Sequence, residues 1–321
     1  MIISSLAWGF FLLLLLPCPA LAAEGKNEVQ AAGESVRNDM RVAEKTRGED
    51  SLGLEEKGRA QWLELEPGLD FGEFRLDPEE AKITALRIDP DRFDFLLGSS
   101  SRMDGKTRTL GQWARDIDLA AAINASMYLP DGSTSTGYMR HGEHVNNPRI
   151  AGRFGAFFVA GPKRVGLPRA AIIDRDMPDW RKILEDYDLV VQNYRMINSK
   201  RRILWSPGGP LYSISAVAQD GKGRILFLHS RSPVEAYSFA QQLLHLPLDV
   251  RTVMYVEGGA QAGLLVRTDK LSREISGAHA PSLLITGNLK APLPNILGAR
   301  RQASKKTLQI PASEAKSDSR E

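Results

Sequence analysis

The chain has 321 residues, of which 42% are hydrophobic and 25% are charged, an ordinary composition for a globular protein. This length suits one large domain or two small ones. The net charge of +3 does not indicate a nucleic-acid partner, because such proteins usually present a concentrated basic face.

The first 23 residues have the pattern of an export signal rather than of a folded segment. Residues 6–16 are almost wholly apolar, and Ala20, Leu21 and Ala22 form the small–x–small pattern of a signal-peptidase site. The apolar run is short for a membrane span, so an uncleaved N-terminal anchor is the alternative. We therefore expect an exported protein, periplasmic or extracellular, that contacts a membrane only through this segment.

The single cysteine, Cys18, lies inside the same segment. Cleavage after Ala22 would leave a mature chain without cysteine, which excludes disulfides, thiol catalysis and cysteine-bound metals. The folded part must then rely on its own hydrophobic core, which its length permits.

Composition divides the remaining chain into three parts. Residues 24–60 are polar with interleaved charges, so we expect a disordered tether. Residues 61–297 contain no internal repeat and no linker, and we expect them to form one domain with a core at about 82–290. Residues 298–321 are polar and basic again, which predicts a disordered tail.

Strand patterns dominate the expected domain. Short apolar runs, rich in β-branched and aromatic residues, predict ten strands at residues 83–88, 93–97, 119–125, 154–160, 189–192, 212–219, 224–229, 252–257, 262–266 and 282–286. Between two of them, residues 220–223 read Asp-Gly-Lys-Gly, a sequence typical of a hairpin turn.

Three helices are expected between the strands. Thr109 opens the first, with apolar residues at helical spacing up to residue 117, and Trp180 begins the second, up to residue 187. A capping box from Ser232 to Glu235 predicts the third at residues 233–246. Many strands with a few helices favour a single α+β domain built on a mixed multi-stranded sheet.

The segment at residues 252–266 is the first candidate for chemistry. An apolar run ends in Glu257, and Gly258 and Gly259 follow before a second apolar run begins. Two glycines let the backbone turn sharply and expose amide groups to a ligand, and such amides can form an anion site. The alternative is a plain hairpin turn with an exposed glutamate.

A second candidate segment follows the strand expected at residues 119–125. A polar loop at residues 129–137 comes next, and it is rich in hydroxyl side chains. The mixture of amide, carboxylate, hydroxyl and guanidinium groups suits a sugar, although a solvated surface loop has the same composition. The residues that offer these groups are Asn124, Asp131, Tyr138 and Arg140.

Histidines supply a third set of candidates. His229 ends an apolar strand just before Arg231 and the expected capped helix, whose N-terminus is a possible phosphate site. An ordinary helix cap beside a surface arginine is the alternative. His141 and His144 are three residues apart with no third ligand nearby, so a polar turn explains them better than a metal site does.

Three sequence motifs occur in an order and spacing that resemble a known family. Residues 123–128 read INASMY, residues 154–158 read FGAFF and residues 256–259 read VEGG. Together they resemble the phosphodiester glycosidase (NAGPA-type) domain, long known in bacteria as a domain of unknown function. The resemblance extends over roughly residues 82–290. It implies hydrolysis of a sugar-1-phosphodiester.

The resemblance also implies particular site residues and shows departures. Site roles pass to Asn124, Glu257, Gly258 and Gly259. Glu257 stands where the family more usually has aspartate, and Ser126 replaces a glycine. Residues 212–215 read Tyr-Ser-Ile-Ser, without the arginine that often precedes this strand in the family. Phosphate binding would then depend on Arg231 or Arg140.

We therefore expect an exported hydrolase of a sugar-1-phosphodiester or related glycoconjugate in the cell envelope. A phosphate monoester is a good leaving group, so one carboxyl group can be sufficient where most glycosidases need two. The expected catalytic residues are Glu257, Asn124 and, as a possible second acid, Asp131. The expected substrate-binding residues are Gly258, Gly259, Arg231, Arg140, Tyr138 and His229.

The sequence demands no cofactor and no metal, although a divalent cation beside the acid and the phosphate is compatible with it. A different class of function is the alternative: a non-catalytic protein that binds or assembles envelope polysaccharide on the same fold. The missing arginine favours that alternative, and the retained Glu-Gly-Gly sequence favours the enzyme.

Overall fold

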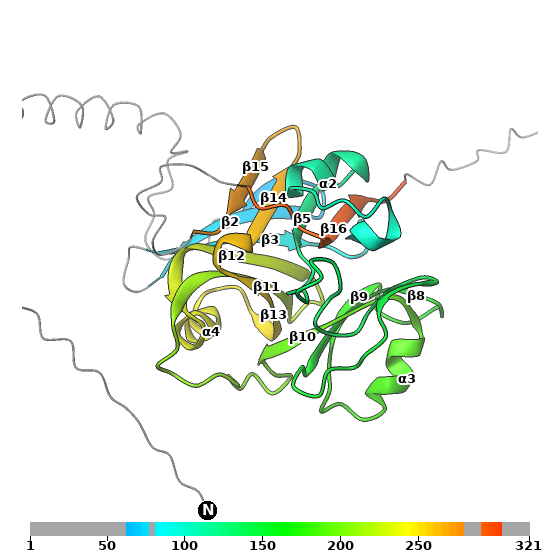
Figure 1. Ribbon diagram of the computed structural model, residues 1–321. Coiled ribbons are helices and arrows are strands. Elements are labelled where there is room, and N and C mark those ends of the chain that lie inside the picture. Colours follow the sequence, from blue (N-terminus) through cyan, green and yellow to red (C-terminus); the bar gives the residue numbers. More distant parts are fainter. Residues whose placement is uncertain (1–61, 77–80, 279–289, 304–321) are drawn as a thin grey trace, which may run out of the picture. The chain divides into compact units, whose positions relative to one another are not determined.

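The computed structural model describes residues 62–76, 81–278 and 290–303, which lie in one unit of the chain, Gly58–Glu321. The expected signal segment and tether, the strand expected at residues 282–286 and the chain from residue 304 onward lie outside the described residues. Two β-sheets and three α-helices make up the described part (Figure 1).

The large sheet has eleven strands. Nine of them follow one another in the order β1 (Leu63–Glu66), β2 (Leu69–Arg75), β3 (Lys82–Ile88), β12 (Ile225–Glu235), β11 (Leu211–Asp220), β13 (Val250–Gly258), β10 (Tyr187–Ile197), β6 (Met139–His141) and β7 (His144–Asn147). Two more strands extend it beside β10, namely β8 (Ala156–Pro162) and β9 (Ala170–Asp174).

The small sheet has five strands. Their order is β15 (Ser272–Ser276), β14 (Gly263–Arg267), β5 (Ala121–Asn124), β16 (Asn295–Arg301) and β4 (Phe93–Ser99). Strand β16 therefore carries the sheet four residues past position 297, where the expected domain boundary lies.

The expected α+β class with a mixed sheet is wrong, because this is a β-rich fold. Every strand pairing among the described residues is antiparallel. Parallel pairs need long crossover connections, usually helical, and most consecutive strands here are joined by short turns. The described α-helices are short: α2 (Leu110–Asp116), α3 (Trp180–Glu185) and α4 (Ala236–His245).

Nine of the ten expected strands are confirmed within the described residues, and so is the hairpin between β11 and β12. The strands that the sequence patterns missed are short or carry charged residues on an exposed face. In the missed strand β2, for example, Asp70 lies opposite Arg87 of β3 and forms an ion pair of 2.7 Å with it. Such charges break the apolar run that marks a strand.

The main hydrophobic core lies between the two sheets. The inward face of the large sheet contributes Val217, Phe227 and Met254, and the small sheet contributes Ile123 and Leu297. All five side chains are fully buried. The fold is therefore a two-sheet sandwich, in which apolar residues from both inner faces fill one layer.

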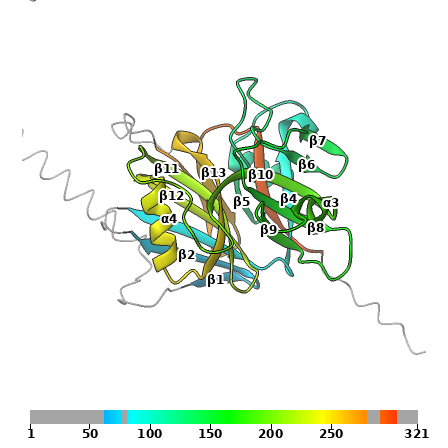
Figure 2. The same ribbon diagram turned by 90° about the horizontal axis from the view of Figure 1, so that it is seen from below.

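Each helix covers an outer face of one sheet (Figures 1 and 2). Phe239 and Leu243 of α4 pack on the outer face of the large sheet, and Trp113 of α2 packs on the outer face of the small sheet. Trp180 of α3 stacks on Phe157 of β8 at a ring distance of 4.9 Å. The helices thus bury the sheet faces that the central core leaves uncovered.

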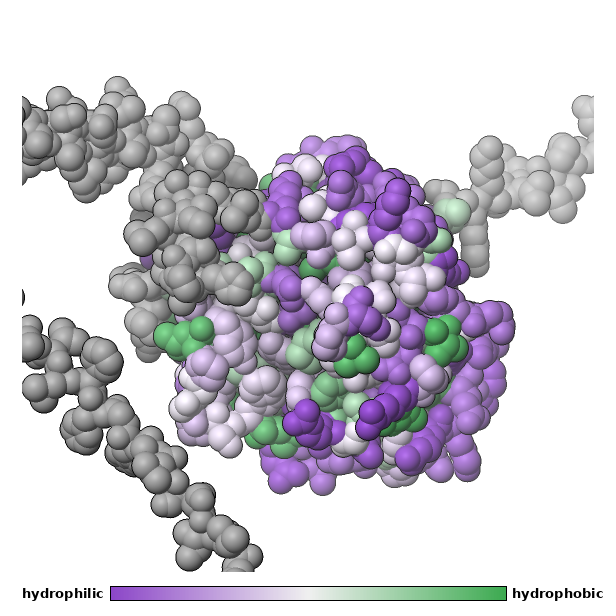
Figure 3. Space-filling model, viewed as in Figure 1, coloured by the Kyte–Doolittle hydropathy of each residue, from purple (hydrophilic) through white to green (hydrophobic). Residues whose placement is uncertain are grey.

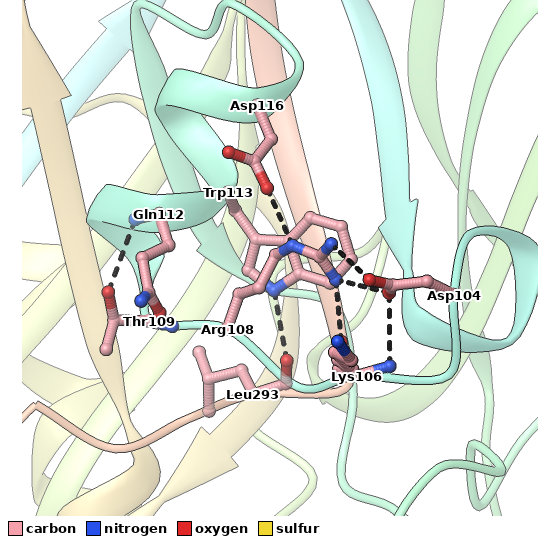
Figure 4. Close-up of polar contacts among 8 residues, drawn as sticks. All are labelled: Asp104, Lys106, Arg108, Thr109, Gln112, Trp113, Asp116 and Leu293. Atoms are coloured by element: carbon pink, nitrogen blue, oxygen red, sulfur yellow. Dashed lines mark hydrogen bonds and ion pairs between the residues drawn. The ribbon is translucent and has the colours of Figure 1, made fainter.

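Helix α2 begins as the sequence predicts. Thr109 and Gln112 form a reciprocal capping box, with hydrogen bonds of 3.2 Å and 2.9 Å between each side chain and the other residue's amide (Figure 4). The indole N–H of Trp113 donates to the Leu293 carbonyl at 3.0 Å, which ties the helix to the chain before β16. Arg108 pairs with Asp104 and Asp116 above the same indole ring.

The capping box predicted at Ser232 and Glu235 is wrong, because β12 continues to Glu235 and α4 begins only at Ala236. The Glu235 carboxylate instead accepts hydrogen bonds from the Gly208 and Gly209 amides and, at 2.6 Å, from the Ser238 hydroxyl. Helix α4 therefore starts five residues after Arg231.

The surface of the described unit is mainly polar. On the face shown in Figure 3, hydrophobic side chains form separate spots among hydrophilic ones. Within the described residues, no helix is both long enough and apolar enough to cross a membrane.

Gln192 of β10 holds the chain at residue 138 and at residues 151–154 in place. Its fully buried side chain accepts from the Tyr138 and Ala151 amides and donates to the carbonyls of Ala151 and Phe154. Gly137 passes directly over this residue. A Cβ atom at position 137 would lie 2.5 Å from the Gln192 carbonyl oxygen and 2.8 Å from the Phe154 ring.

We expect Gly137→Ala to lower the free energy of unfolding by about 1–3 kcal/mol, because the backbone of a buried strand cannot give way to the new methyl group. Thermal and urea unfolding measure the effect. Gly152→Ala is the matched control, since a Cβ there meets nothing within 4 Å. Equal stability of the two variants would contradict this account of the loop.

Candidate functional site

A row of buried polar side chains crosses the middle of the large sheet. Glu257 of β13 lies opposite Ser215 of β11, and Ser215 lies opposite His229 of β12. Their exposed fractions are 6%, 0% and 1%. Polar groups are rarely buried without hydrogen-bond partners, so such a row indicates a specific role.

A β-bulge sets the position of Glu257 in this row. Ser215 pairs with Glu257 while the next residue, Ala216, pairs with Tyr255, so Val256 is an extra residue on β13. Tyr255 packs in the outer core under α4, and Val256 packs between the sheets. Bulges shift the direction of the following side chain, and here the shift sets the acid opposite Ser215.

Glu257 has the proton affinity of a general acid or base. Burial raises the pKa of its carboxyl group to about 7, and the Gly258 amide, which donates to Oε1 at 2.9 Å, partly opposes that rise. A carboxyl group with this pKa can gain and lose a proton near neutral pH. Burial is the main cause of the raised pKa values of Tyr128 and Tyr255, and the negative charge of Glu257 raises them further.

The chain crosses from the large sheet to the small sheet directly after Glu257. Strand β13 ends at Gly258, the turn η2 (Gly259–Gln261) follows, and β14 begins at Gly263 in the small sheet. Both glycines are needed for this crossing. A Cβ at Gly258 would lie 2.3 Å from the Tyr255 hydroxyl, and Gly259 has a φ of +70°.

Asn124, at the end of β5, holds the crossing in place. Its amide group donates to the Gln261 carbonyl at 2.7 Å, and its oxygen accepts from the Gly263 amide at 2.8 Å. The same Gly263 amide lies 3.0 Å from the Ser215 hydroxyl. Asn124 is thus linked through Gly263 to Ser215, which is the strand neighbour of Glu257.

His229 contacts this network through Ser215. Its Nδ1 lies 3.1 Å from the Ser215 hydroxyl, and its buried Nε2 has no hydrogen-bond partner among the described residues. Burial, with the nearby charge of Arg231, lowers the pKa of His229 to about 3, so the ring is neutral at physiological pH. Its role in substrate binding stays a prediction.

The other predicted site residues lie apart from this network. Asp131 is exposed and caps its own loop by accepting from the Ser133 and Thr134 amides. Arg140 donates to the carbonyls of Leu184 and Tyr187 and to the Tyr138 hydroxyl. These contacts hold the C-terminal end of α3 against β10.

Arg231 is exposed on β12, and its carbonyl accepts from the Ser213 hydroxyl. None of its described contacts reaches Glu257. The site roles of Asp131, Arg140, Tyr138 and Arg231 therefore stay predictions. The two histidines weighed as a metal pair contact Arg102 and Ser101 instead, His141 at 2.7 Å and His144 at 3.0 Å.

An open hollow that the sequence did not reveal lies against Tyr255. Its volume is about 540 Å³. It is bordered by Met127, Arg153, Gly155, Tyr194, Arg195, Leu204, Trp205 and Tyr255. Tyr255 stands two residues before Glu257, and Met127 belongs to the INASMY segment. Gly155 belongs to the FGAFF segment, and no motif marks the remaining residues, because they come from separate loops and strands.

The sequence matches the phosphodiester glycosidase family over residues 118–299, a range that includes the buried row and the hollow. The chain belongs to this family. The resemblance drawn from the three motifs is thus confirmed, and membership supports a phosphodiester glycosidase-like function. No curated protein matches the chain.

Two solved structures share the fold of this family member. A hypothetical protein from Synechocystis is 13% identical with a TM-score of 0.53, and the match covers 77% of this chain and 64% of that one. The zebrafish N-acetylglucosamine-1-phosphodiester alpha-N-acetylglucosaminidase catalytic domain, auto-inhibited by its pro-peptide, is 10% identical with a TM-score of 0.52. That match covers 76% of this chain and 87% of the zebrafish chain. Identities this low show a common fold alone.

The raised pKa of Glu257 predicts a pH-dependent stability. Its pKa is about 7 in the folded protein against an ordinary value of 4.5, so between these values the folded state keeps a proton that the unfolded state has lost. Stability must therefore fall as the pH rises from 4.5 to 7, by on the order of 3 kcal/mol in total. Glu257→Gln removes this titration.

We expect the stability of Glu257→Gln, relative to the natural protein, to increase between pH 4 and pH 8 and then to level off. Urea unfolding at a series of pH values measures the difference. Glu64→Gln, which changes an exposed glutamate, is the control. A difference that stays constant with pH would show that Glu257 has an ordinary pKa.

Proposed function

We propose that this protein is a hydrolase that cleaves the bond between a sugar and the phosphate of a sugar-1-phosphodiester, with Glu257 as the catalytic carboxyl group. The observation that carries the proposal is the burial of this acid at a strand end, with a pKa near neutrality, in a member of the phosphodiester glycosidase family. Perturbed acids in such places are typical of catalytic groups.

The proposed reaction uses Glu257 as a general base. The carboxylate takes a proton from a water molecule, whose oxygen forms a bond to the anomeric carbon of the sugar. The bond from that carbon to the phosphate oxygen breaks, and the phosphate monoester leaves with the electron pair. Because this leaving group is stable as an anion, the reaction needs less help from a second acid than an ordinary glycosidase reaction does.

The surrounding residues have supporting parts in this reaction. Asn124 holds the crossing segment, so that the Gly258 amide stays bonded to the acid and the Gly259 amide keeps one orientation beside it. A preorganised amide such as that of Gly259 stabilises negative charge that develops on phosphate oxygens. The neutral ring of His229 leaves the row without a second charge that would change the pKa of Glu257.

Turnover tests the proposal directly. We expect the protein to hydrolyse an aryl or UDP-linked sugar phosphodiester, with kcat/KM rising as the pH increases through about 7, because the base must be deprotonated. Glu257→Gln should lower kcat by about 10²–10⁴-fold, the usual contribution of a general base. Glu64→Gln should keep full activity.

A non-catalytic polysaccharide-binding or assembly protein is the second candidate. The observation that favours it is Tyr212, which stands in the run where the family often has an arginine and whose ring lies 6.4 Å from that of Tyr255. If a broad panel of sugar phosphodiesters gives no turnover while the protein retains an envelope glycan, this second candidate replaces the enzyme.

We also propose that the protein is exported to the cell envelope, on the evidence of the apolar run at residues 6–16 and the small–x–small pattern that follows it. Cell fractionation with N-terminal sequencing of the product should find a mature chain that begins at Ala23. A cytoplasmic chain that retains Met1 would refute export without bearing on the catalytic site.

A further inference from the structure

We propose that the hollow bordered by Tyr255, two residues before Glu257, is the subsite for the phosphoryl group of the substrate and the ring that adjoins it. Arg153 is the ligand of the anionic oxygens, and Trp205 is the surface on which the ring stacks. This inference rests on the proposed function, because it assigns the recognition of the same substrate. It replaces Arg231 and Arg140 as the expected phosphate ligands.

Aromatic rings form a continuous wall of the hollow. The Trp205 ring lies 5.2 Å from that of Tyr255 and 5.9 Å from that of Tyr194, and Phe154 packs behind Tyr194 at 4.3 Å. These contacts hold Trp205 although it lies in the loop between β10 and β11. A fixed, half-buried aromatic face suits a planar or cyclic ligand, because little freedom is lost on binding.

The two arginines of the hollow differ in their charge balance. Arg195 pairs with Asp174 and, at 2.7 Å, with Asp176, so its positive charge is already neutralised. Arg153 is exposed and makes no hydrogen bond or ion pair with any residue that the structure describes. It is thus the free cation at this site. A guanidinium group binds phosphate oxygens through two parallel hydrogen bonds.

The backbone that carries Arg153 is held on both sides. The Ala151 amide and carbonyl bond to Gln192 at 2.8 Å and 2.9 Å, and the Phe154 carbonyl bonds to Gln192 at 2.9 Å. The Gly152 carbonyl accepts from Arg175 at 2.6 Å. A charged side chain on a fixed backbone is a preorganised anion site rather than a mobile surface group.

The hollow has the size and the position that the proposed substrate requires. A volume of about 540 Å³ falls within the range of small-molecule sites, which is roughly 300–1,000 Å³. Tyr255 belongs both to the hollow and to the strand end that carries Glu257. On the other side, Tyr128 follows Met127 of the hollow, and its hydroxyl accepts from the side chain of Gln261 in the crossing turn.

Binding to the Glu257→Gln protein tests the subsite without turnover. The probes are the methyl phosphodiesters of the 1-phosphates of glucose, N-acetylglucosamine, galactose and mannose, each set against the neutral methyl glycoside of the same sugar, with calorimetry as the measurement. We expect at least one phosphodiester to bind, and Arg153→Ala to weaken it about tenfold or more without affecting the glycoside. Arg149→Ala is the matched control, because it removes an exposed arginine of the same loop that does not border the hollow.

Trp205 gives an independent test of the same subsite. Trp205→Ala should weaken binding of the phosphodiester about tenfold, and Trp205→Phe should restore most of the affinity because it keeps a ring for stacking. Thermal unfolding of both variants separates loss of the ring from loss of the fold. Affinity that is unchanged in Trp205→Ala would overturn the stacking assignment.

The outcomes separate this inference from the proposed function. Binding that depends on Arg153 and Trp205, in a natural protein that turns over no phosphodiester, would support the subsite and refute the hydrolase. Turnover that depends on Glu257 but is unchanged in Arg153→Ala would support the hydrolase and refute the subsite. Failure of every phosphodiester in the panel to bind would overturn the subsite.

Discussion

The crossing of the chain between the two sheets is the constraint on which the candidate site depends. Strand β13 must leave the large sheet and enter the small one within a few residues, and only glycine fits at position 258 against the Tyr255 hydroxyl. Asn124 of the small sheet and Ser215 of the large sheet bind the same amide of Gly263. One hydrogen-bonded centre thus sets the distance between the sheets and fixes the residue before the crossing, Glu257.

A buried carboxyl group at this centre destabilises the fold, since its pKa near 7 reflects lost solvation that no cation compensates. A glutamine would fill the same space without a charge. An ionisable group at the junction of the two sheets therefore adds nothing to stability. The hydrolysis that we propose would use it, because that chemistry requires a proton to be gained and lost near neutral pH.

Much of the sandwich could be predicted from the sequence, because its inner strands are apolar runs on both faces. The expected α+β fold class was wrong for two physical reasons. Strands that contain charged residues, such as β2 with Asp70, lack the apolar run that marks a strand. The Ser-x-x-Glu pattern at Ser232 was compatible with a helix cap, but Glu235 found other donors at Gly208 and Gly209. Glu257 and Asn124 could be found because they lie in recognisable motifs, whereas the aromatic residues of the hollow are brought together only by folding.

The raised pKa of Glu257 depends on the absence of an arginine beside it. A guanidinium beside the acid would favour the carboxylate and lower its pKa by one to three units, roughly back to its ordinary value. In this chain the corresponding run contains Tyr212, whose ring packs against that of Tyr255 at 6.4 Å. Only the Gly258 amide opposes the effect of burial. With Arg153 as the phosphate ligand that we propose instead, the phosphate would be held by a cation that plays no part in setting the pKa of Glu257.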